Sequence, residues 1–252
     1  SFFWASWFLD KNTANKLFAV YALCRRLDDL VDTSNENSEA KEEIARVISL
    51  TNNNQYKETF EEFKSIDSKL HPRQDIIIEF LKGQLSDLDF RQPNDLGQLL
   101  KYCYRVAGVV GLMICDVLDI RDSKLRYFAI DFGIAMQLTN ICRDIKEDAQ
   151  IGRIYLPKNE TASLAIGNFK SPSNTDLIII NSSRDKLIKL ADEYYQSGMY
   201  GINQLPKKIK RSFRVASNIY QGIGHKILKK RCSFNEQRVY LSKSEKLNLT
   251  IK

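Results

Sequence analysis

The sequence predicts an all-α protein with a single domain. The 252 residues include only 11 glycines and 5 prolines, so few positions interrupt a helix. Apolar residues recur at spacings of three and four through most of the chain, which is the period of a helix with one buried face. No segment alternates strongly between apolar and polar residues. We therefore expect one domain of packed helices over residues 1–252.

The composition excludes several other classes of protein. Hydrophobic residues make up 43% of the chain and charged residues 27%, which is typical of a globular protein and not of a disordered tail or a disulfide scaffold. The apolar runs at Ser1–Leu9 and Leu177–Ile180 are shorter than the roughly 18 residues of a membrane span. The chain begins with Ser and shows no signal peptide, so we expect its N-terminus to be incomplete.

The cysteines and histidines indicate a reduced compartment without zinc. The chain has 5 Cys and no C-x-x-C pair, which favours free thiols and a cytoplasmic location. With only two histidines, a zinc site has almost no ligands. The sequence also lacks a P-loop and a Gly-rich dinucleotide motif.

The first half of the chain predicts helices in order. Residues 13–32 carry apolar side chains at helical spacing, and the polar segment 33–38 ends the pattern. Further helices are expected over 39–50, about 56–65 and 73–90, with a loop at 52–55. Residues 96–118 are apolar nearly all round, which predicts a buried helix in which Gly108 and Gly111 allow a close approach of a neighbour or a ligand.

The second half continues the helical pattern. Residues 123–148 form the longest helical window that we expect. The stretch over 152–172 is rich in Gly, Pro, Asn and Ser and predicts an ordered connection with a short helical insert. Periodic apolar helices then resume over 174–201 and 207–231.

Two polar stripes interrupt otherwise apolar helices. The first consists of Tyr21, Arg25, Asp28 and Asp32, at steps of four, three and four residues. The second consists of Gln137, Asn140, Asp144 and Asp148, at steps of three, four and four. These spacings place the members of each stripe on one helix face. Apolar stripes lie beside them, so we expect both helices to pack in the core with the acids at its edge.

The stripes admit two interpretations. A polar stripe on a helix is usually a solvated face. However, Asp and Asn are poor helix formers compared with Glu, Gln and Lys, and like charges four residues apart repel. A face that is merely solvated would therefore favour other residues. Carboxylates that face each other can instead hold a diphosphate through Mg²⁺, which takes carboxylate oxygens, water and phosphate oxygens. Arg25 and Arg143 would then pair with the remaining phosphate charge.

At these residues the sequence resembles the squalene/phytoene synthase family, and most of all its bacterial phytoene synthases. The likeness extends over nearly the whole chain and follows the order of the family's motifs. The matching segments are Ser1–Ser6, Tyr21–Asp32 with its Asp28-Asp29-x2-Asp32, Gly83-x3-Asp87-Leu88, Tyr102–Met113, Gln137–Asp148, Gly152–Pro157, Ile219-Tyr220 and Arg238–Ser242.

The resemblance implies an isoprenoid-synthase helical bundle with a central cavity. Its metal ligands would be Asp28, Asp32, Asn140, Asp144 and Asp148, and its catalytic residues would be Asp28, Asp32, Asp144, Asp148, Tyr21 and Arg25. The residues that the resemblance assigns to substrate binding are Phe2, Tyr102, Val106, Gly111, Gln137, Asn140, Arg143, Arg153, Tyr155, Tyr220 and Arg238. For each aromatic residue plain core packing is the competing interpretation, and for each arginine a solvated charge.

The activity that the resemblance implies is the head-to-head condensation of two geranylgeranyl diphosphates to phytoene, in carotenoid biosynthesis. Mg²⁺ or Mn²⁺ would assist loss of diphosphate, and the reaction would pass through a cyclopropylcarbinyl diphosphate (prephytoene diphosphate). No NADPH is needed if phytoene is the product. A squalene or dehydrosqualene synthase acting on farnesyl diphosphate remains the alternative, because one sequence reveals neither tunnel depth nor access to NADPH.

Two further alternatives stay open. Asp28-Asp29-x2-Asp32 also fits terpene cyclases and head-to-tail prenyltransferases, but those lack the Tyr102–Gly111 segment. A non-catalytic assembly factor of the same fold is expected to lose acids from the metal motifs, whereas all four aspartates are present at 28, 32, 144 and 148.

Basic clusters occur at Lys207–Arg211 and Lys229–Arg231, and the net charge is +7. They are either solvated faces or a peripheral contact with anionic lipid at the inner face of the membrane. No nucleic-acid motif accompanies the charge, so we expect no nucleic-acid partner. The sequence leaves the oligomeric state open.

Overall fold

The computed structural model describes residues 7–33, 37–52, 60–161, 164–230 and 238–251. Within these ranges the structure contains helices and no strand, which confirms the all-α prediction. The helices are α2 (Lys11–Thr33), α3 (Asn37–Asn52), α5 (Gln74–Leu88), α6 (Leu96–Cys103), α7 (Val109–Val117), α8 (Ser123–Arg143), α9 (Ile145–Gln150), α10 (Ile166–Lys170), α11 (Asn174–Ile202), α12 (Lys207–Lys230) and α13 (Lys243–Ile251). Short helical turns lie at η1 (Glu61–Phe63), η2 (Ser68–Leu70), η3 (Tyr104–Gly108) and η4 (Lys158–Glu160).

Two expectations about these elements are wrong. The window 123–148 is not one helix, because α8 ends at Arg143 and α9 begins at Ile145, and the longest helix is instead α11, with 29 residues. Of the helix expected over 56–65, residues 56–59 lie outside the described residues, and the rest forms only the 3₁₀ turn η1.

Side-chain caps fix where several helices begin. The Asp95 carboxylate accepts a hydrogen bond from the backbone N–H of Gln98 at 2.9 Å, and Asp122 does the same for Leu125 at 2.9 Å. At α11, Ser173 and Asp176 accept from each other's backbone N–H groups. Each cap satisfies a donor that the first helical turn leaves without an intrahelical partner.

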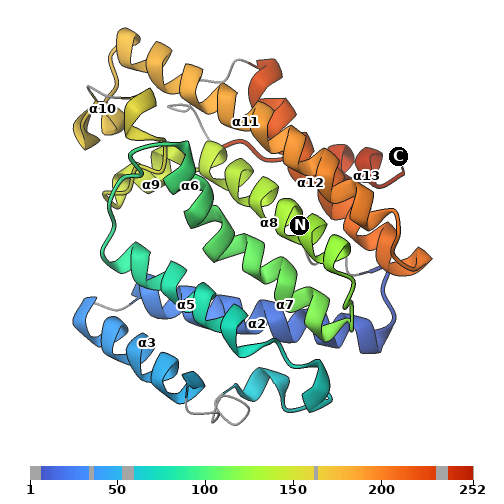
Figure 1. Cartoon of the computed structure of the whole chain (residues 1–252). Coiled ribbons are helices and arrows are strands. Elements are labelled where there is room, and N and C mark those ends of the chain that lie inside the picture. Colours follow the sequence, from blue (N-terminus) through green and yellow to red (C-terminus); the bar gives the residue numbers. More distant parts are fainter. Residues whose placement is uncertain (1–6, 34–36, 53–59, 162–163, 231–237, 252) are drawn as a thin grey trace.

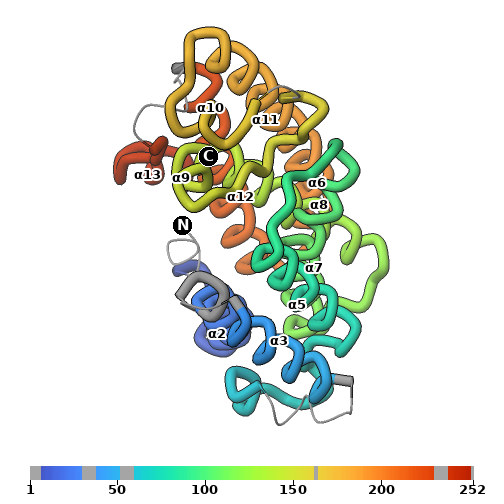
Figure 2. Tube along the Cα trace, turned by 90° about the vertical axis from the view of Figure 1, so that its left-hand side faces the viewer, coloured from blue at the N-terminus to red at the C-terminus, as the bar shows by residue number. Residues whose placement is uncertain are grey.

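Helix α8 runs through the middle of the bundle, with α7 on one side and α11 and α12 on the other (Figure 1). One apolar core lies among α6, α8, α11 and α12, and a second lies among α2, α3, α5 and α7. Helices α2 and α3 lie at the bottom of the molecule and α10 at the top in two perpendicular views (Figure 2). Residues from α2, α7, α8, α11 and α12 therefore face one another around a shared interior.

Helices α6 and α7 form one rod that contains the π-helical turn η3. At this turn and just beyond it the rod lies very close to α8. A Cβ atom on Gly111 would stand 2.3 Å from the carbonyl oxygen of Ala129, and one on Gly133 would stand 2.3 Å from that of Ala107. Only glycine fits at such a crossing, so the expected close approach is to a neighbouring helix.

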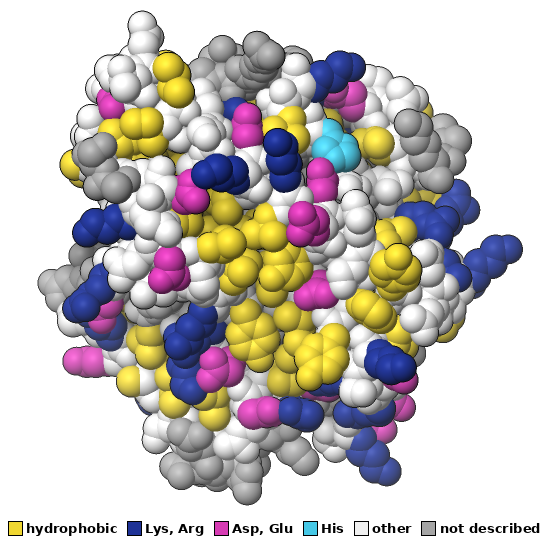
Figure 3. All heavy atoms as spheres, turned by 45° about the horizontal axis from the view of Figure 1, so that its top comes forward, with side chains coloured by type: hydrophobic (Ala, Val, Ile, Leu, Met, Phe, Trp, Pro, Cys, Tyr) yellow, Lys and Arg dark blue, Asp and Glu magenta, His cyan; other side chains and the backbone are white. Residues whose placement is uncertain are grey.

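The described cysteines are free thiols, as the sequence predicts: Cys24, Cys103, Cys115 and Cys142. Cys232 lies outside the described residues. Of the helices that the structure describes, none has an apolar stretch long enough to span a membrane. A band of apolar side chains nevertheless reaches the surface across one face of the bundle, with acidic and basic side chains along its borders (Figure 3).

Candidate functional site

A polar cavity of about 190 Å³ lies where α2, α5, α6, α8 and α9 meet. The residues that line it are Arg25, Asp28, Gln84, Asp87, Tyr102, Gln137, Asn140, Ile141, Asp144, Asp148, Arg153 and Tyr155. The two polar stripes of the sequence thus supply opposite walls, Asp28 on α2 and the acids of α8 and α9. Ionisable and amide side chains make up most of the lining, which is unusual beside an apolar core.

The helix break at Asp144 does not scatter the second stripe. The backbone N–H of Asp144 bonds to the carbonyl of Asn140 at 2.9 Å, and that of Asp148 to the carbonyl of Asp144 at 2.8 Å. Because these four-residue steps persist through the break, Asn140, Asp144 and Asp148 still line one cavity.

Asp87 on α5 is a hydrogen-bonding centre of the cavity wall. Its two carboxylate oxygens accept from the hydroxyls of Tyr102 and Tyr155, each at 2.9 Å. The two tyrosine rings stack with their centroids 4.9 Å apart. Burial, and then the Asp87 charge, raise the pKa of both hydroxyls. These hydroxyls therefore stay protonated and keep donating to Asp87.

Asp144 lies between two guanidinium groups. Arg143 donates to its oxygens at 2.7 and 2.5 Å, and Arg238 at 2.7 and 2.9 Å. Bidentate pairs of this kind are strong and fix the plane of the carboxylate. The sequence predicts Arg143 and Arg238 as diphosphate contacts, and the structure brings both to a predicted metal ligand at the cavity wall.

The α2 wall shows a different arrangement. The Asp28 carboxylate accepts from the Gln84 amide at 2.9 Å. Arg25 pairs with Asp29 at 2.7 Å, and both side chains of that pair are well exposed. Both lie one turn or less from Asp28, so the α2 wall carries acid and base side by side.

Asp148 carries the clearest electrostatic perturbation of the site. Burial, and then the neighbouring Asp144 charge, raise its pKa to about 7, while Arg153 opposes the shift. Asp87 and Glu147 add smaller contributions in the same direction as Asp144. An acid held this far above its ordinary pKa lies in a surplus of negative charge, which a bound cation would relieve.

The residues present fit a hard divalent cation. The Asn140 side-chain oxygen is buried and has no hydrogen-bond partner among the described residues, so it is available as a ligand beside Asp144 and Asp148. Within the described ranges no three His, Cys, Asp or Glu side chains converge on one metal position. A donor set of one or two carboxylates and an amide leaves the remaining positions to water and phosphate oxygens, as is usual for Mg²⁺.

An apolar cavity of about 280 Å³ adjoins the polar one. Gln137 and Asn140 line both cavities. From these two residues the apolar cavity runs between α2, η3–α7, α8, α11 and α12, and its walls are formed mostly by aliphatic and aromatic side chains. Charged and amide side chains in one cavity and a hydrocarbon-lined space in the adjoining one would suit an amphiphilic ligand with a charged head and a long tail.

The structure divides the predicted site residues between the two cavities. The polar cavity takes Arg25, Asp28, Tyr102, Gln137, Asn140, Asp144, Asp148, Arg153 and Tyr155, and the apolar cavity takes Tyr21, Val106, Gly111, Tyr220, Gln137 and Asn140. Gly111 also meets α8 directly, as described above. Phe2 lies outside the described residues, and so does the side chain of Asp32, whose backbone lies in the last turn of α2. The catalytic and binding roles of all these residues stay predictions.

Sequence reasoning did not assign Gln84 and Asp87 to the site, although both stand in the Gly83-x3-Asp87 segment. A detectable signal was present: the two polar residues lie three apart on a helix whose neighbours Phe80, Leu81 and Leu88 are buried. Gln84 itself is only 3% exposed. A buried polar residue needs partners, and those of Gln84 and Asp87 are the predicted site residues.

Comparisons with known proteins agree on one family. The family described as squalene/phytoene synthase matches residues 1–245. The 15-cis-phytoene synthase of Enterobacter agglomerans is 32% identical over 265 residues, which cover 100% of this chain and 89% of that protein. The 15-cis-phytoene synthase of Pantoea ananas is 30% identical over 266 residues, with 100% and 85% covered.

Solved structures show the same fold. A dehydrosqualene synthase in complex with a ligand superposes with a TM-score of 0.82 at 30% sequence identity and covers 100% of this chain and 89% of its own. A squalene synthase from Alicyclobacillus acidocaldarius superposes with a TM-score of 0.74 at 16% identity, with 90% and 87% covered. The second likeness is one of fold alone.

Proposed function

The chain belongs to the squalene/phytoene synthase family and is a prenyltransferase of the head-to-head class, and from this premise we propose that it condenses two geranylgeranyl diphosphates to phytoene. The single observation that carries the proposal is the junction of the two cavities at Gln137 and Asn140. The junction lets a diphosphate remain among the charged groups while its prenyl chain lies in the apolar space.

The polar cavity supplies the groups that would hold Mg²⁺ and the diphosphates. Asn140, Asp144 and Asp148 from α8 and α9, and Asp28 from α2, would be the metal ligands, together with Asp32, which follows Asp28 by four residues in the sequence. When bound, Mg²⁺ supplies positive charge that stabilises the departing diphosphate. Arg143 pairs with Asp144 in this structure and would be able to donate to a phosphate oxygen of a bound diphosphate.

Asp87 and its tyrosines keep the shape of the cavity wall. The two Tyr–Asp87 hydrogen bonds lock the rings of Tyr102 and Tyr155 against each other, and Phe90 packs edge-on against Tyr155 at 5.1 Å. Arg153 donates to the backbone carbonyl of Asp87 at 3.3 Å, which ties the segment after α9 to α5. Side chains held in this way stay in place when charged ligands enter.

The apolar cavity excludes water from the reacting carbons. Loss of diphosphate from an allylic C–O bond leaves a carbocation that water would quench, so the adjoining space must be dry. Phe132 and Phe213, whose rings pack edge-on with centroids 6.2 Å apart, line this space. Aromatic faces stabilise positive charge without donating a nucleophilic oxygen or nitrogen.

In the proposed reaction, the double bond of the second substrate attacks the cation, and a proton is lost to give a cyclopropylcarbinyl diphosphate. A second loss of diphosphate, followed by rearrangement and loss of another proton, gives the conjugated triene centre of phytoene. Two diphosphates and two protons leave, so no electrons are required from outside. A dehydrosqualene synthase makes the corresponding product from farnesyl diphosphate, and it is the second candidate because a structure of that class superposes on this chain.

Product analysis tests the proposal. The purified chain is incubated with Mg²⁺ and either farnesyl or geranylgeranyl diphosphate, each with and without NADPH, and the hydrocarbons are identified by mass spectrometry. We expect a C40 triene from geranylgeranyl diphosphate, unchanged by NADPH. A C30 hydrocarbon alone would favour the second candidate, and a cyclic C20 product would contradict head-to-head condensation.

A further inference from the structure

We propose that Gln137 is a positioning residue, whose side-chain oxygen holds the Asn140 amide so that the amide oxygen faces the polar cavity as a cation ligand. This role differs from the substrate contact that the resemblance in the sequence assigns to Gln137. The inference rests on the proposed function, because it concerns one ligand of the cation that would hold the diphosphates.

The Asn140 amide can present either of two atoms to a cation. Its oxygen is an acceptor and can bind a metal ion, whereas its NH₂ group carries two donor hydrogens and repels one. The two ends have nearly the same shape, so packing alone scarcely distinguishes the two orientations. The hydrogen bonds of the amide therefore decide which atom reaches the cation.

Gln137 supplies the hydrogen bond that orients this amide. The Nδ2 group of Asn140 donates to Oε1 of Gln137 at 3.3 Å. The two residues lie three apart on α8, so their side chains share one helix face. The opposite atom of the amide, Oδ1 of Asn140, is buried and has no hydrogen-bond partner among the described residues. A buried acceptor in this state is costly, and a bound cation would satisfy it.

The charges of the polar cavity favour the opposite orientation. Among the described residues, four aspartates and two arginines line this cavity together with Asn140. Carboxylates accept hydrogen bonds and attract the NH₂ group of an amide. Without the contact to Gln137, the amide would therefore turn its NH₂ group toward the acids. The cation would then lose an oxygen ligand, so Gln137 acts against this rotation.

The helix that carries both residues is held in place, so rotation of the amide is the main freedom that remains. The Thr139 hydroxyl donates to the Ala135 carbonyl at 2.9 Å and bonds to the Tyr195 hydroxyl of α11 at 3.0 Å. Thr139 and Tyr195 are each 1% exposed. Helix α8 lies in the middle of the bundle with α11 beside it (Figure 1). A change at Gln137 should therefore act on the Asn140 side chain and not on the course of α8.

The test measures the affinity for Mn²⁺, which requires no turnover. Mn²⁺ is titrated into the purified enzyme, with and without geranylgeranyl thiodiphosphate, and the free ion is quantified by electron paramagnetic resonance. Gln137→Leu keeps the approximate size of the side chain and removes its oxygen. Loss of a group that orients a metal ligand lowers affinity roughly 10–100-fold, so we expect a fall of about tenfold. An unchanged affinity in Gln137→Leu that is folded by circular dichroism would overturn the inference.

Gln137→Glu guards against loss of folding or of cavity shape. A carboxylate only accepts hydrogen bonds, so this variant should still hold the NH₂ group of Asn140 and bind Mn²⁺ at least as tightly as the wild type. A fall like that of Gln137→Leu would contradict the inference. The matched control is Gln221→Leu on α12, where the amide donates to Asp192 at 2.9 Å and lines neither cavity. The control should bind Mn²⁺ as the wild type does, and an equal loss there would also contradict the inference.

The Asn140→Asp background separates orientation from every other effect of Gln137. A carboxylate has an oxygen at both ends, so its rotation by half a turn changes nothing for a cation. Adding Gln137→Leu to Asn140→Asp should therefore change the Mn²⁺ affinity by less than about twofold, because the two substitutions are coupled. A tenfold fall in this background as well would show that Gln137 does not act by orienting the amide.

The inference and the proposed function fail on different measurements. A wild type that shows the expected dependence of Mn²⁺ affinity on Gln137 but forms no C40 hydrocarbon refutes the proposed function and supports the orientation of Asn140. A wild type that forms the C40 hydrocarbon but loses no Mn²⁺ affinity in Gln137→Leu refutes the inference alone. A wild type that binds no Mn²⁺ in either titration also contradicts the inference.

Discussion

The polar cavity and the apolar cavity are built on opposite principles. In the polar cavity, carboxylates, amides and guanidinium groups crowd into a space of about 190 Å³, and the polar atoms at the tip of each side chain determine its role. In the apolar cavity, aliphatic and aromatic side chains lie beside helix crossings at which glycine allows close contact, and the volume of each side chain determines its role. Replacement with a side chain of equal shape should therefore destroy function in the polar cavity and preserve it in the apolar cavity.

The largest change in turnover is expected from Asp28→Asn, in the polar cavity. This change keeps the shape of the side chain and removes its charge, so the fold should persist while turnover falls by about 10²–10³-fold or more. Asp144→Ala should abolish turnover in the same way. Steady-state rates with geranylgeranyl diphosphate and Mg²⁺ measure the loss, and circular dichroism checks the helices.

Glu193→Gln is the matched control for these charge removals. Glu193 is an exposed carboxylate on α11 that lines neither cavity. Its variant should keep wild-type turnover. Substantial activity in Asp28→Asn or Asp144→Ala would show that the polar cavity does not work through its charges.

The next largest effect is expected from adding one methyl group at the helix crossing. Gly133→Ala places a Cβ atom 2.3 Å from the carbonyl oxygen of Ala107, so η3 and α8 must separate. Overpacking of this kind costs about 1–3 kcal/mol of unfolding free energy, measurable by urea denaturation. Gly167→Ala on α10 meets no atom within 4 Å and should leave stability unchanged or raise it; equal losses in both variants would contradict the packing account.

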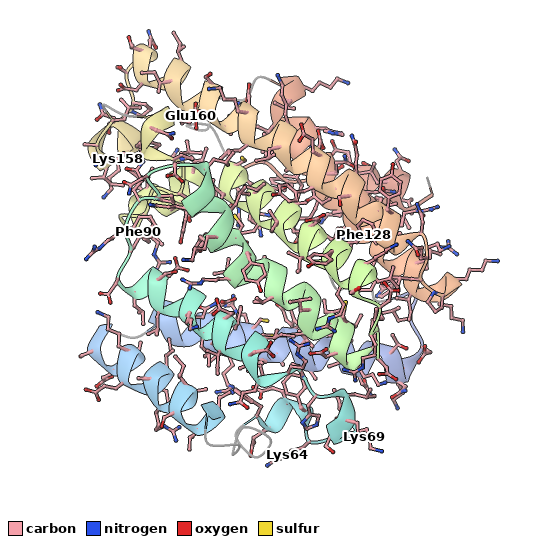
Figure 4. The ribbon with its side chains drawn as sticks, in the orientation of Figure 1. Lys64, Lys69, Phe90, Phe128, Lys158 and Glu160 are labelled. Atoms are coloured by element: carbon pink, nitrogen blue, oxygen red, sulfur yellow. The ribbon has the colours of Figure 1, made fainter. Side chains whose placement is uncertain are left out.

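A smaller effect concerns the basic surface at the start of α12, beside the apolar cavity. Lys207 and Lys208 are exposed at the start of α12, two and three residues after the lining residue Leu205, and α12 contains no acidic residue. Basic residues near an anionic membrane contribute about 1 kcal/mol each, so Lys207→Glu with Lys208→Glu should weaken sedimentation with phosphatidylserine vesicles. Lys158→Glu on η4, near α10 (Figure 4), is the matched control and should bind as the wild type does. Equal vesicle binding by the wild type and both variants would show that the start of α12 and the surface at η4 do not differ in affinity for anionic lipid.

The smallest effect sharpens the electrostatics of the polar cavity. Burial and the Asp144 charge raise the pKa of Asp148 to about 7. Its ionisation therefore favours the unfolded chain, and stability is lost as the pH rises from about 4 through 7. Asp148→Asn should match the wild type at pH 4 and exceed it at pH 8 by about 1 kcal/mol after solvent screening, or about 2–4 °C in Tm. A variant less stable than the wild type at pH 8 would contradict the charge surplus.

The fold was largely predictable because its signals are local. Breaker-poor segments with apolar spacing of three and four marked most of the helices, and the bounds agree within a few residues for α2, α5, α11 and α12. Two features escaped this reasoning. At the break at Asp144 the backbone hydrogen bonds still join residues four apart, so the spacing of the side chains does not change. The π turn η3 has no residue composition that distinguishes it from an α-helix. Neither feature therefore leaves a pattern in the sequence.

The site was predictable where polar residues interrupt apolar helices. Asp28, Asn140, Asp144 and Asp148 were found in this way and line one cavity. Pairings between distant segments were not predictable, because they depend on how helices cross. The approach of Arg238 to Asp144 joins residues 94 positions apart, and the Tyr155 contact with Asp87 spans 68. That Gln137 and Asn140 line both cavities likewise follows from how the helices pack.

The π turn at Tyr104–Gly108 acts as a one-residue insertion in the long rod of α6 and α7. Each residue turns a helix by about 100°, so the inserted residue rotates the side chains of α7 relative to those of α6 by about that angle. With it, Tyr102 reaches Asp87 while Val106 and Ala107 face the hydrocarbon space. Deleting one residue here would leave a regular helix in which one half is rotated relative to the other. Tyr102 could then no longer contact Asp87 while Val106 and Ala107 line the apolar cavity.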